Sequence, residues 1–182
     1  MKQRGFLTAL LAIWLTGCSA VYSTNPVGEK PYPIKEKDWK GIWLNKDAVI
    51  SIKVVDEANG TIKMAWVEWK DREAKLECYE VLLRQWEQWV FGNVKDQNKD
   101  GKVIYFWAPI KFSEDQFLCW RPKAEKFREL GKEGKLPCRE EGDSDCVLGD
   151  LSPEHLRIMT SQIEQLYEWD DPLVFVRIIK SN

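Results

Sequence analysis

The sequence predicts a mainly β protein, in which antiparallel strands follow one another as a meander and close into a small barrel or half-barrel. Apolar and polar residues alternate with a period of two in several segments, and Asn-Gly or Asp-Gly dipeptides separate some of them. Helical patterns are confined to two short segments late in the chain. Closure of the sheet removes its unpaired edges, so we expect a barrel; a two-sheet sandwich is the alternative.

The first clear strand runs from Ala48 to Val55, with Ile50, Ile52 and Val54 on one face and polar residues between them. The next strand presents a matching set of apolar side chains: Ile62, Met64 and Trp66.

Asn59-Gly60 lies between these two strands and indicates a hairpin. A two-residue loop would place the two apolar sets on opposite faces, because a shift by one residue reverses every side chain. We therefore expect a three-residue loop, Ala58-Asn59-Gly60. The expected cross-strand pairs are Val54 with Met64 and Ile52 with Trp66.

The following segments complete the expected sheet. Leu76–Phe91 is rich in strand-forming residues, but its alternation is interrupted, which indicates a bend or bulge near Arg84–Gln88. The polar run Asp96–Gly101 indicates a turn in which Gly101 adopts a positive φ angle. Three more strands are expected, at Val103–Trp107, Gln116–Arg121 and Leu173–Ile179.

The same polar run matches the first half of a calcium-binding loop, with Asp96, Asn98, Asp100 and Gly101 in sequence. The twelfth position of such a loop carries a bidentate Glu, but here it is Trp107, inside an expected strand. A polar turn is the preferred interpretation, and no metal site is expected.

Two helices are expected after the main run of strands. Lys123–Leu130 has apolar residues at helical spacing and ends before Gly131, a typical C-terminal stop. Ser152 and Pro153 supply an N-cap and a first-turn proline for the second helix. Its inward face is expected to carry Leu156, Met159 and Ile163.

The composition argues against nucleic-acid binding and against most catalytic mechanisms. Residues 18–182 hold 25 basic and 29 acidic side chains, with no basic stripe along the chain. His155 is the only histidine, and the sequence has no nucleophile elbow and no glycine-rich phosphate loop. We therefore expect a non-catalytic protein with no cofactor and no nucleic-acid partner.

Four cysteines remain once Cys18 is set aside, and they allow three disulfide pairings. Cys138 and Cys146 enclose a short polar loop and form the expected first pair. Cys78 and Cys119 are then the default second pair, joining two expected strands.

The first residues have the three-part pattern of a secretory signal. Lys2 and Arg4 precede an apolar run from Phe6 to Leu15, and small residues follow it. The run of ten residues is too short for a helix that spans a bilayer, which needs about 20. Its ending, Leu15-Thr16-Gly17-Cys18, resembles the lipobox of bacterial lipoproteins.

The lipobox resemblance implies cleavage before Cys18, a lipid on the Cys18 thiol and acylation of the new amino terminus. Ser19 follows the cysteine, not Asp, which by resemblance to enterobacterial sorting favours the outer membrane, with the folded part facing the periplasm. The chain then divides into a signal peptide (residues 1–17), an extended lipidated tether rich in proline (residues 18–37) and a single β-rich domain (residues 38–182).

Gly41-Ile42-Trp43, at the start of the expected domain, resembles the opening strand of the lipocalin and calycin group. The resemblance implies a small up-and-down barrel in which an arginine of the last strand lies over the tryptophan. Arg177 occupies that place in this sequence and is expected to stack on Trp43. The interior of the barrel would be lined by Ile52, Met64, Trp66 and Trp107.

Two functions are compatible with these features. The first is binding of a small apolar or amphipathic ligand in a lipocalin-like barrel. The second is an interaction or inhibitor module that contacts an envelope protein or polysaccharide through exposed tryptophans. Trp69 and Trp89 are candidates for that surface, since each lies three residues after another tryptophan and so faces the opposite side of a regular strand.

Overall fold

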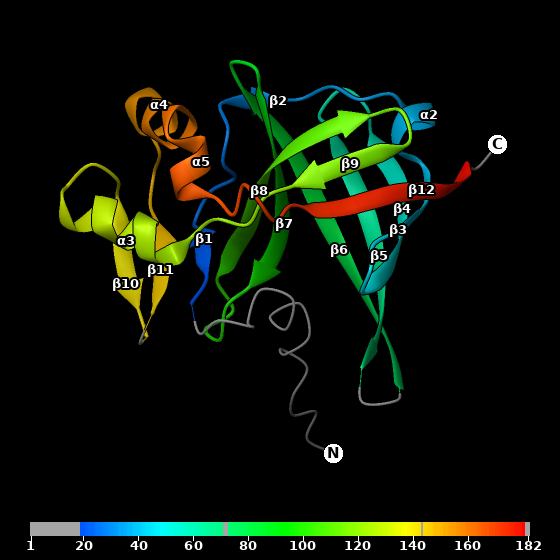
Figure 1. Cartoon of the computed structure of the whole chain (residues 1–182), viewed down its shortest axis with the longest axis horizontal. Coiled ribbons are helices and arrows are strands. Elements are labelled where there is room, and N and C mark those ends of the chain that lie inside the picture. Colours follow the sequence, from blue (N-terminus) through cyan, green and yellow to red (C-terminus); the bar gives the residue numbers. More distant parts are fainter. Residues whose placement is uncertain (1–18, 71–72, 143, 181–182) are drawn as a thin grey trace.

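Eight antiparallel strands form a closed barrel in the computed structural model, which describes residues 19–70, 73–142 and 144–180 (Figure 1). The last strand pairs with the first strand of the barrel and with β9, and β9 returns to β8, so the sheet closes on itself. The expected barrel is confirmed over the two-sheet sandwich. Its strands are β3 (Gly41–Leu44), β4 (Ala48–Asp56), β5 (Thr61–Lys70), β6 (Glu73–Trp86), β7 (Trp89–Gln97), β8 (Val103–Ser113), β9 (Gln116–Cys119) and β12 (Leu173–Lys180).

A smaller sheet branches from the barrel at β8. The first half of β8 pairs with β1 (Val21–Ser23), while its second half pairs with β9. β1 also pairs in parallel with β11 (Asp145–Leu148), and β11 pairs with β10 (Cys138–Glu141) in antiparallel orientation. The two halves of one long strand therefore hold two different sheets together.

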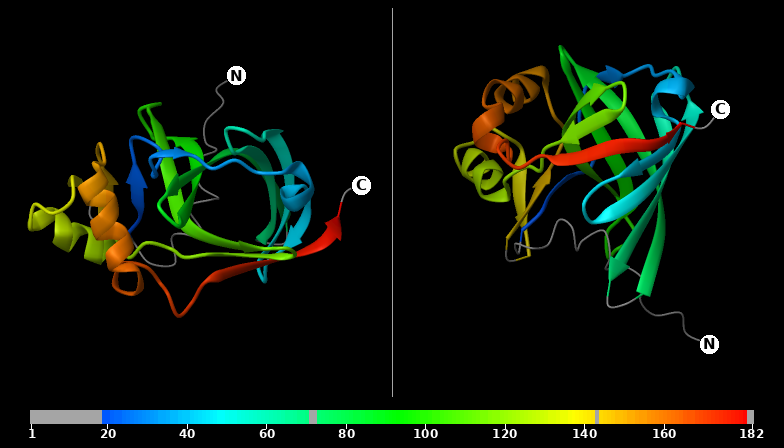
Figure 2. Two further views of the ribbon diagram at one scale, coloured as in Figure 1. Left: turned by 90° about the horizontal axis from the view of Figure 1, so that it is seen from above. Right: turned by 45° about the vertical axis from the view of Figure 1, so that its right-hand side comes forward.

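Helices cover one side of the barrel, beside the smaller sheet (Figures 1 and 2). They are α3 (Ala124–Lys132), α4 (Pro153–Ser161) and α5 (Ile163–Leu166). The two expected late helices correspond to α3 and α4, and α4 begins with the expected cap, in which the Ser152 hydroxyl accepts from the His155 N–H. The short α2 (Glu36–Trp39) lies instead at the upper end of the barrel in Figure 1. In the described residues no helix has the length and apolar character needed to span a bilayer.

The register of the first hairpin differs from the expectation by two residues. Ile52 pairs with Met64 and Val54 with Ile62, because the turn takes four residues (57–60) and a bulge follows Val54. The Asp56 carboxylate accepts hydrogen bonds from the backbone and side chain of Asn59, which stabilises this longer turn. Both apolar sets still share one face, since the shift is an even number of residues.

The segment Leu76–Phe91 is not one bent strand but two strands joined by a tight turn. Trp86 and Trp89 face each other across the ladder, and Glu87 between them has a φ of 50°. The sequence at this turn contains no Gly, Asn or Asp, so it lacks the usual hairpin signal. The polar turn before Val103 forms as expected, with Gly101 at a φ of 76°.

The expected tether is wrong for residues 19–37, which pack against the barrel. β1 is built into the sheet, and β2 (Lys30–Pro31) pairs with β6. Val27 is fully buried, and its backbone N–H donates to the side chain of Asn93 at 2.6 Å. The amide of Asn93 in turn donates to the Val27 carbonyl at 3.1 Å. Prolines here set extended backbone that lies along the fold, not a free linker. Cys18 itself lies outside the described residues.

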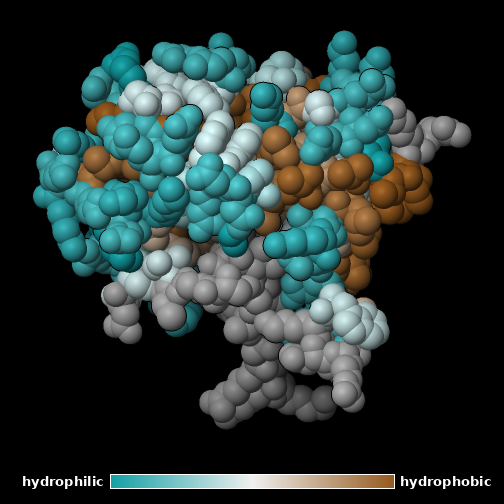
Figure 3. Space-filling model, viewed as in Figure 1, coloured by the Kyte–Doolittle hydropathy of each residue, from teal (hydrophilic) through white to brown (hydrophobic). Residues whose placement is uncertain are grey.

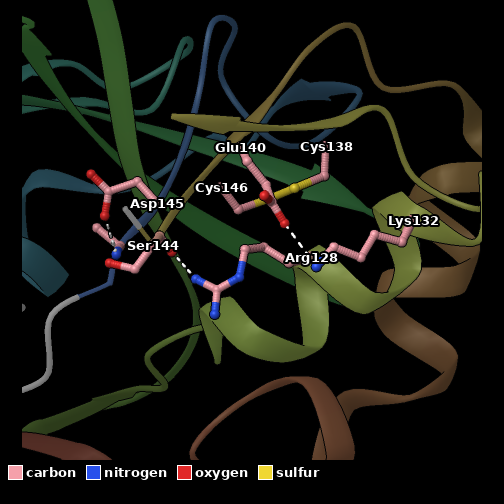
Figure 4. The surroundings of a disulfide bond; sticks show 8 residues. Arg128, Lys132, Cys138, Glu140, Ser144, Asp145 and Cys146 are labelled. Carbon is pink, nitrogen blue, oxygen red and sulfur yellow. Dashed lines mark hydrogen bonds and ion pairs between the residues drawn. A yellow bond between two sulfur atoms is a disulfide. The ribbon is translucent and has the colours of Figure 1, made fainter. Parts of the chain in front are cut away.

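One disulfide joins Cys138 to Cys146 as expected and links β10 to β11. Figure 4 shows that α3 lies beside this pair, with Lys132 facing Glu140 and Arg128 facing Ser144. Lys132 forms an ion pair with Glu140 at 3.0 Å, and Arg128 donates to the Ser144 carbonyl. The expected second disulfide is wrong, since Cys78 and Cys119 are free thiols. Cys78 is exposed on the outer face of β6, whereas Cys119 on β9 borders the barrel interior.

Replacing Asn93 with alanine should lower the free energy of unfolding by about 2–4 kcal/mol, because it leaves the buried N–H and C=O of Val27 without partners. Equilibrium urea unfolding measures the change. The matched control is Asn59→Ala in the exposed turn, which we expect to cost under about 1 kcal/mol. Equal effects for the two variants would contradict the anchoring of the N-terminal segment by Asn93.

Candidate functional site

The upper end of the barrel is closed by Arg177 and the rings beneath it. The Arg177 guanidinium lies over the indole of Trp43, with Cζ 4.5 Å from the ring centroid, which confirms the expected stacking. It also donates to the backbone carbonyls of Lys37 and Asp38 in α2 and of Glu114 before β9. One side chain therefore ties α2 and the β8–β9 turn to the last strand.

Closure of this end of the barrel also requires a glycine at position 41, the first residue of the Gly-x-Trp sequence. Its φ is 144°, and a Cβ atom at this position would lie 2.4 Å from the Ile179 carbonyl of β12. Only glycine allows β3 and β12 to approach so closely at this end. Beneath Arg177 the space is filled by Trp43, Trp39, Phe112 and Phe117, whose rings contact one another.

Below these rings the barrel contains an apolar cavity of about 100 Å³. Its wall is made by side chains from most of the barrel strands, including Ile52, Met64, Trp66, Val81, Ala108 and Cys119. The Nε1–H of Trp66 is buried and has no hydrogen-bond partner among the described residues. The Nε1–H of Trp107, which also borders the cavity, has no partner among the described residues either, so the cavity is apolar with two unused donors on residues of its wall.

The lower end of the barrel interior is polar. Going down β5 and β6, the inward positions change from Trp66 and Val81 to Glu68, Glu77 and Tyr79. Glu68 is 8% exposed, and its Oε1 has no hydrogen-bond partner. The Tyr79 hydroxyl donates to Glu77, and burial together with this carboxylate raises the pKa of Tyr79 well above its ordinary value. Tyr79 is therefore a neutral donor over the whole physiological range.

Two further charged side chains lie near Glu68, Glu77 and Tyr79. Lys75 lies directly across the strand pair from Glu68, and Asp96 on β7 is close enough to act on Tyr79. Among the side chains that the structure describes, the lower end of the interior thus holds the carboxylates of Glu68, Glu77 and Asp96 and the ammonium group of Lys75. An apolar cavity continues into an interior layer that is acidic overall.

All four residues expected to line the interior border the cavity, although Trp107 does so from the outer side of the wall. Ile52, Met64 and Trp66 are part of the cavity wall, on neighbouring strands β4 and β5. Trp107 also borders the cavity, but its ring packs against Phe127 and Tyr167 on the outer side of the wall. Trp107 pairs with Asn93, whose side chain faces outward as well.

Several interior residues were missed by sequence reasoning. Phe117 and Phe175 stack on each other across β9 and β12, with centroids 4.5 Å apart. β9 has only four residues, and β12 is a nearly continuous apolar run, so neither strand shows the alternation that would place these rings inside. Glu68 was missed because a carboxylate is ordinarily assigned to the solvent face; its position two residues after Trp66 was the available signal.

The two exposed-tryptophan candidates have different surroundings. Trp69 on β5 is 74% exposed, whereas Trp89 on β7 is half-buried and packs edge-on against Trp169. His155 is engaged in the cap of α4, since its Nδ1 accepts from the Ser152 N–H at 3.1 Å. Among the described residues no group of three or more His, Cys, Asp or Glu side chains is arranged to hold a metal ion.

The two free thiols should differ sharply in reactivity. Burial raises the pKa of the Cys119 thiol to about 12, so at pH 8 it is protonated and unreactive, while Cys78 is exposed. Alkylation of the folded protein at pH 8, read by peptide mass spectrometry, should label Cys78 and leave Cys119 unlabelled until denaturant is added. Rapid labelling of Cys119 in the folded protein would contradict its position at the interior of the barrel.

No protein-family model matches the sequence, and comparison with curated proteins and with solved structures finds no similar protein.

Proposed function

We propose that this chain is a lipid-anchored envelope protein whose barrel binds, without catalysis, the apolar part of a small amphipathic molecule. The observation that carries the proposal is the apolar cavity of about 100 Å³ inside a closed barrel. A well-packed core of this size has few voids larger than a water molecule, so an apolar space of this volume is a feature that folding alone does not require.

The volume limits the ligand. Sites for drug-sized molecules have volumes of about 300–1,000 Å³. A cavity of about 150 Å³ lined by apolar side chains stays dry and holds benzene. The volume here therefore favours a short alkyl chain or a single small ring, and disfavours a long fatty acyl chain.

The polar layer limits the other end of the ligand. A carboxylate placed near Glu68, Glu77 and Asp96 would meet like charges at low dielectric, which is unfavourable. An amine would meet the unpartnered oxygen of Glu68, and a neutral hydroxyl could bond to the same atom. We therefore infer a ligand whose polar end is cationic or neutral.

The anchor is supported by the sequence Leu15-Thr16-Gly17-Cys18, and Ser19 after it favours the outer membrane, with the folded part facing the periplasm. A second candidate function, contact with an envelope partner through exposed tryptophan, is favoured by Trp69 alone. Trp89 has its own packing partner in Trp169.

Titration of the protein with straight-chain amines, alcohols and carboxylates of four to ten carbons tests the proposed function. We expect saturable changes in tryptophan fluorescence for short amines and alcohols, because Trp66 lies in the cavity wall, and weak or no changes for carboxylates. Ala108→Leu fills the cavity from β8 and should reduce the affinity at least tenfold.

Ala65→Leu is the matched control, since the same substitution then lies on the outer face of β5, opposite the exposed Ser51 and Cys78. It should leave the affinity unchanged. Saturable binding that survives Ala108→Leu would place the ligand elsewhere, and no binding of any compound would contradict the proposed function. Mass spectrometry of the N-terminal peptide tests the anchor separately, through the acyl mass on Cys18.

A further inference from the structure

The outer face of the β5–β6 hairpin is apolar along its whole lower half. Trp69 is 74% exposed and Leu76 is 66% exposed, the two highest values among the large hydrophobic residues described. Cross-strand pairs of this face join Val67 to Leu76 and Trp69 to Ala74. The outward side chains of this face, which we name the hairpin face, are Ala65, Val67, Trp69, Ala74, Leu76 and Cys78.

The polarity of the hairpin reverses between its two halves. In the upper half Ile62 and Val81 are buried inside the barrel, and Lys63 and Glu80 point outward. In the lower half the carboxylate of Glu68 is inside, and the apolar side chains are outside. A sheet that has water on its outer side normally carries polar residues there. Apolar-out and polar-in is the arrangement of strands whose outer face meets lipid.

The hairpin face continues across three more strands. In one row across the sheet, Leu76 pairs with Val67, Val67 with Val49, Val49 with Leu44 and Leu44 with Val176. All five side chains are at least 37% exposed. Figure 3 shows the hydrophobic surface gathered on the side of the molecule where β3 and β12 lie. A contiguous exposed apolar surface of this kind marks a site of interaction.

The start of the described chain fixes which end of the molecule meets a membrane. Ala20 is 7% exposed, and its N–H donates to Asp145 at 2.8 Å, so the fold begins there. Ala20 is two positions after Cys18 in the sequence, a backbone reach of about 7 Å. Figures 1 and 2 show that β1 begins at the lower end of the molecule, and that β5 and β6 project beyond the barrel at this same end.

We propose that the hairpin face rests on the bilayer that holds the lipid of Cys18, as a second membrane contact. The proposal rests on the lipid anchor inferred above. A short connection to the lipid brings the lower end of the barrel to the membrane surface, where the hairpin face is the exposed apolar surface of that end. Tryptophan is favoured at the level of the lipid headgroups, because its ring has an apolar body and a polar N–H.

The lipidated full chain, reconstituted in vesicles of phosphatidylethanolamine and phosphatidylglycerol, tests this contact. Cys78 lies on the hairpin face and is free, so it accepts an environment-sensitive thiol fluorophore. We expect its emission to move to shorter wavelength in vesicles and to lose most of its intensity when the acyl chains are brominated. Trp69→Lys combined with Leu76→Lys should abolish both effects while the lipid still holds the protein on the vesicles.

Val55→Lys is the matched control, because Val55 is 52% exposed at the opposite end of β4. It should behave as the wild type. If the fluorophore on Cys78 keeps the emission wavelength that it has in water when vesicles are present, and the acyl mass is found on Cys18, the membrane contact is overturned and the anchor is left intact. A shift of the emission to shorter wavelength that occurs without vesicles and grows with protein concentration would also overturn the membrane contact. It would show that the hairpin face binds a second copy of the chain. Absence of the acyl mass refutes the anchor itself.

Discussion

The guanidinium of Arg177 over the indole of Trp43 is the contact on which the closed barrel depends. Arg177 is 9% exposed, and a buried cation is costly unless its donors are paired. Here the donors meet backbone carbonyls at Lys37, Asp38 and Glu114, and the flat face of the group meets the Trp43 ring. These partners belong to α2, the turn between β8 and β9, and the first barrel strand. The same side chain therefore unites the two ends of the barrel sequence.

Closure at one end determines what the interior can do. The rings beneath Arg177 fill the upper part, so the cavity lies in the middle and continues only toward the polar layer at Glu68 and Tyr79. A second core on the outer side of β7 and β8 supports the wall, through Phe91, Trp107 and the α3 and α5 helices. Alternation along β7 and β8 assigns each side chain to one of the two cores. This division explains why so many tryptophans are compatible with a small cavity.

The parts of the fold that were predictable have local signals. Period-two alternation placed β4 and β5, the serine cap placed α4, and the short polar loop identified the Cys138–Cys146 pair. The Gly-x-Trp resemblance led to Arg177 and Trp43. Each of these depends on residues that are close in sequence or on the single side-chain contact that the resemblance implied.

The parts that failed depend on long-range packing. Pro26 and Gly28 suggest a linker, but the pairing of β1 and β2 and a buried asparagine 66 residues after Val27 hold that segment to the barrel. Parity alone could not show that Cys78 and Cys119 face opposite sides, because the strands between them include the unexpected turn at Glu87. Trp107 lies on the outer side of the wall because its ring packs against Phe127 of α3, a helix that comes later in the chain. Such facts are set by tertiary contacts, which a pattern along the chain does not contain.

The central claim is that the middle of the barrel is a dry apolar space. Diffraction from a crystal pressurised with xenon tests it most directly, because xenon enters apolar cavities of this kind. We expect one xenon peak bordered by Met64, Trp66 and Val81. An ordered chain of water molecules at that position, or side chains that fill it and exclude xenon, would contradict the account.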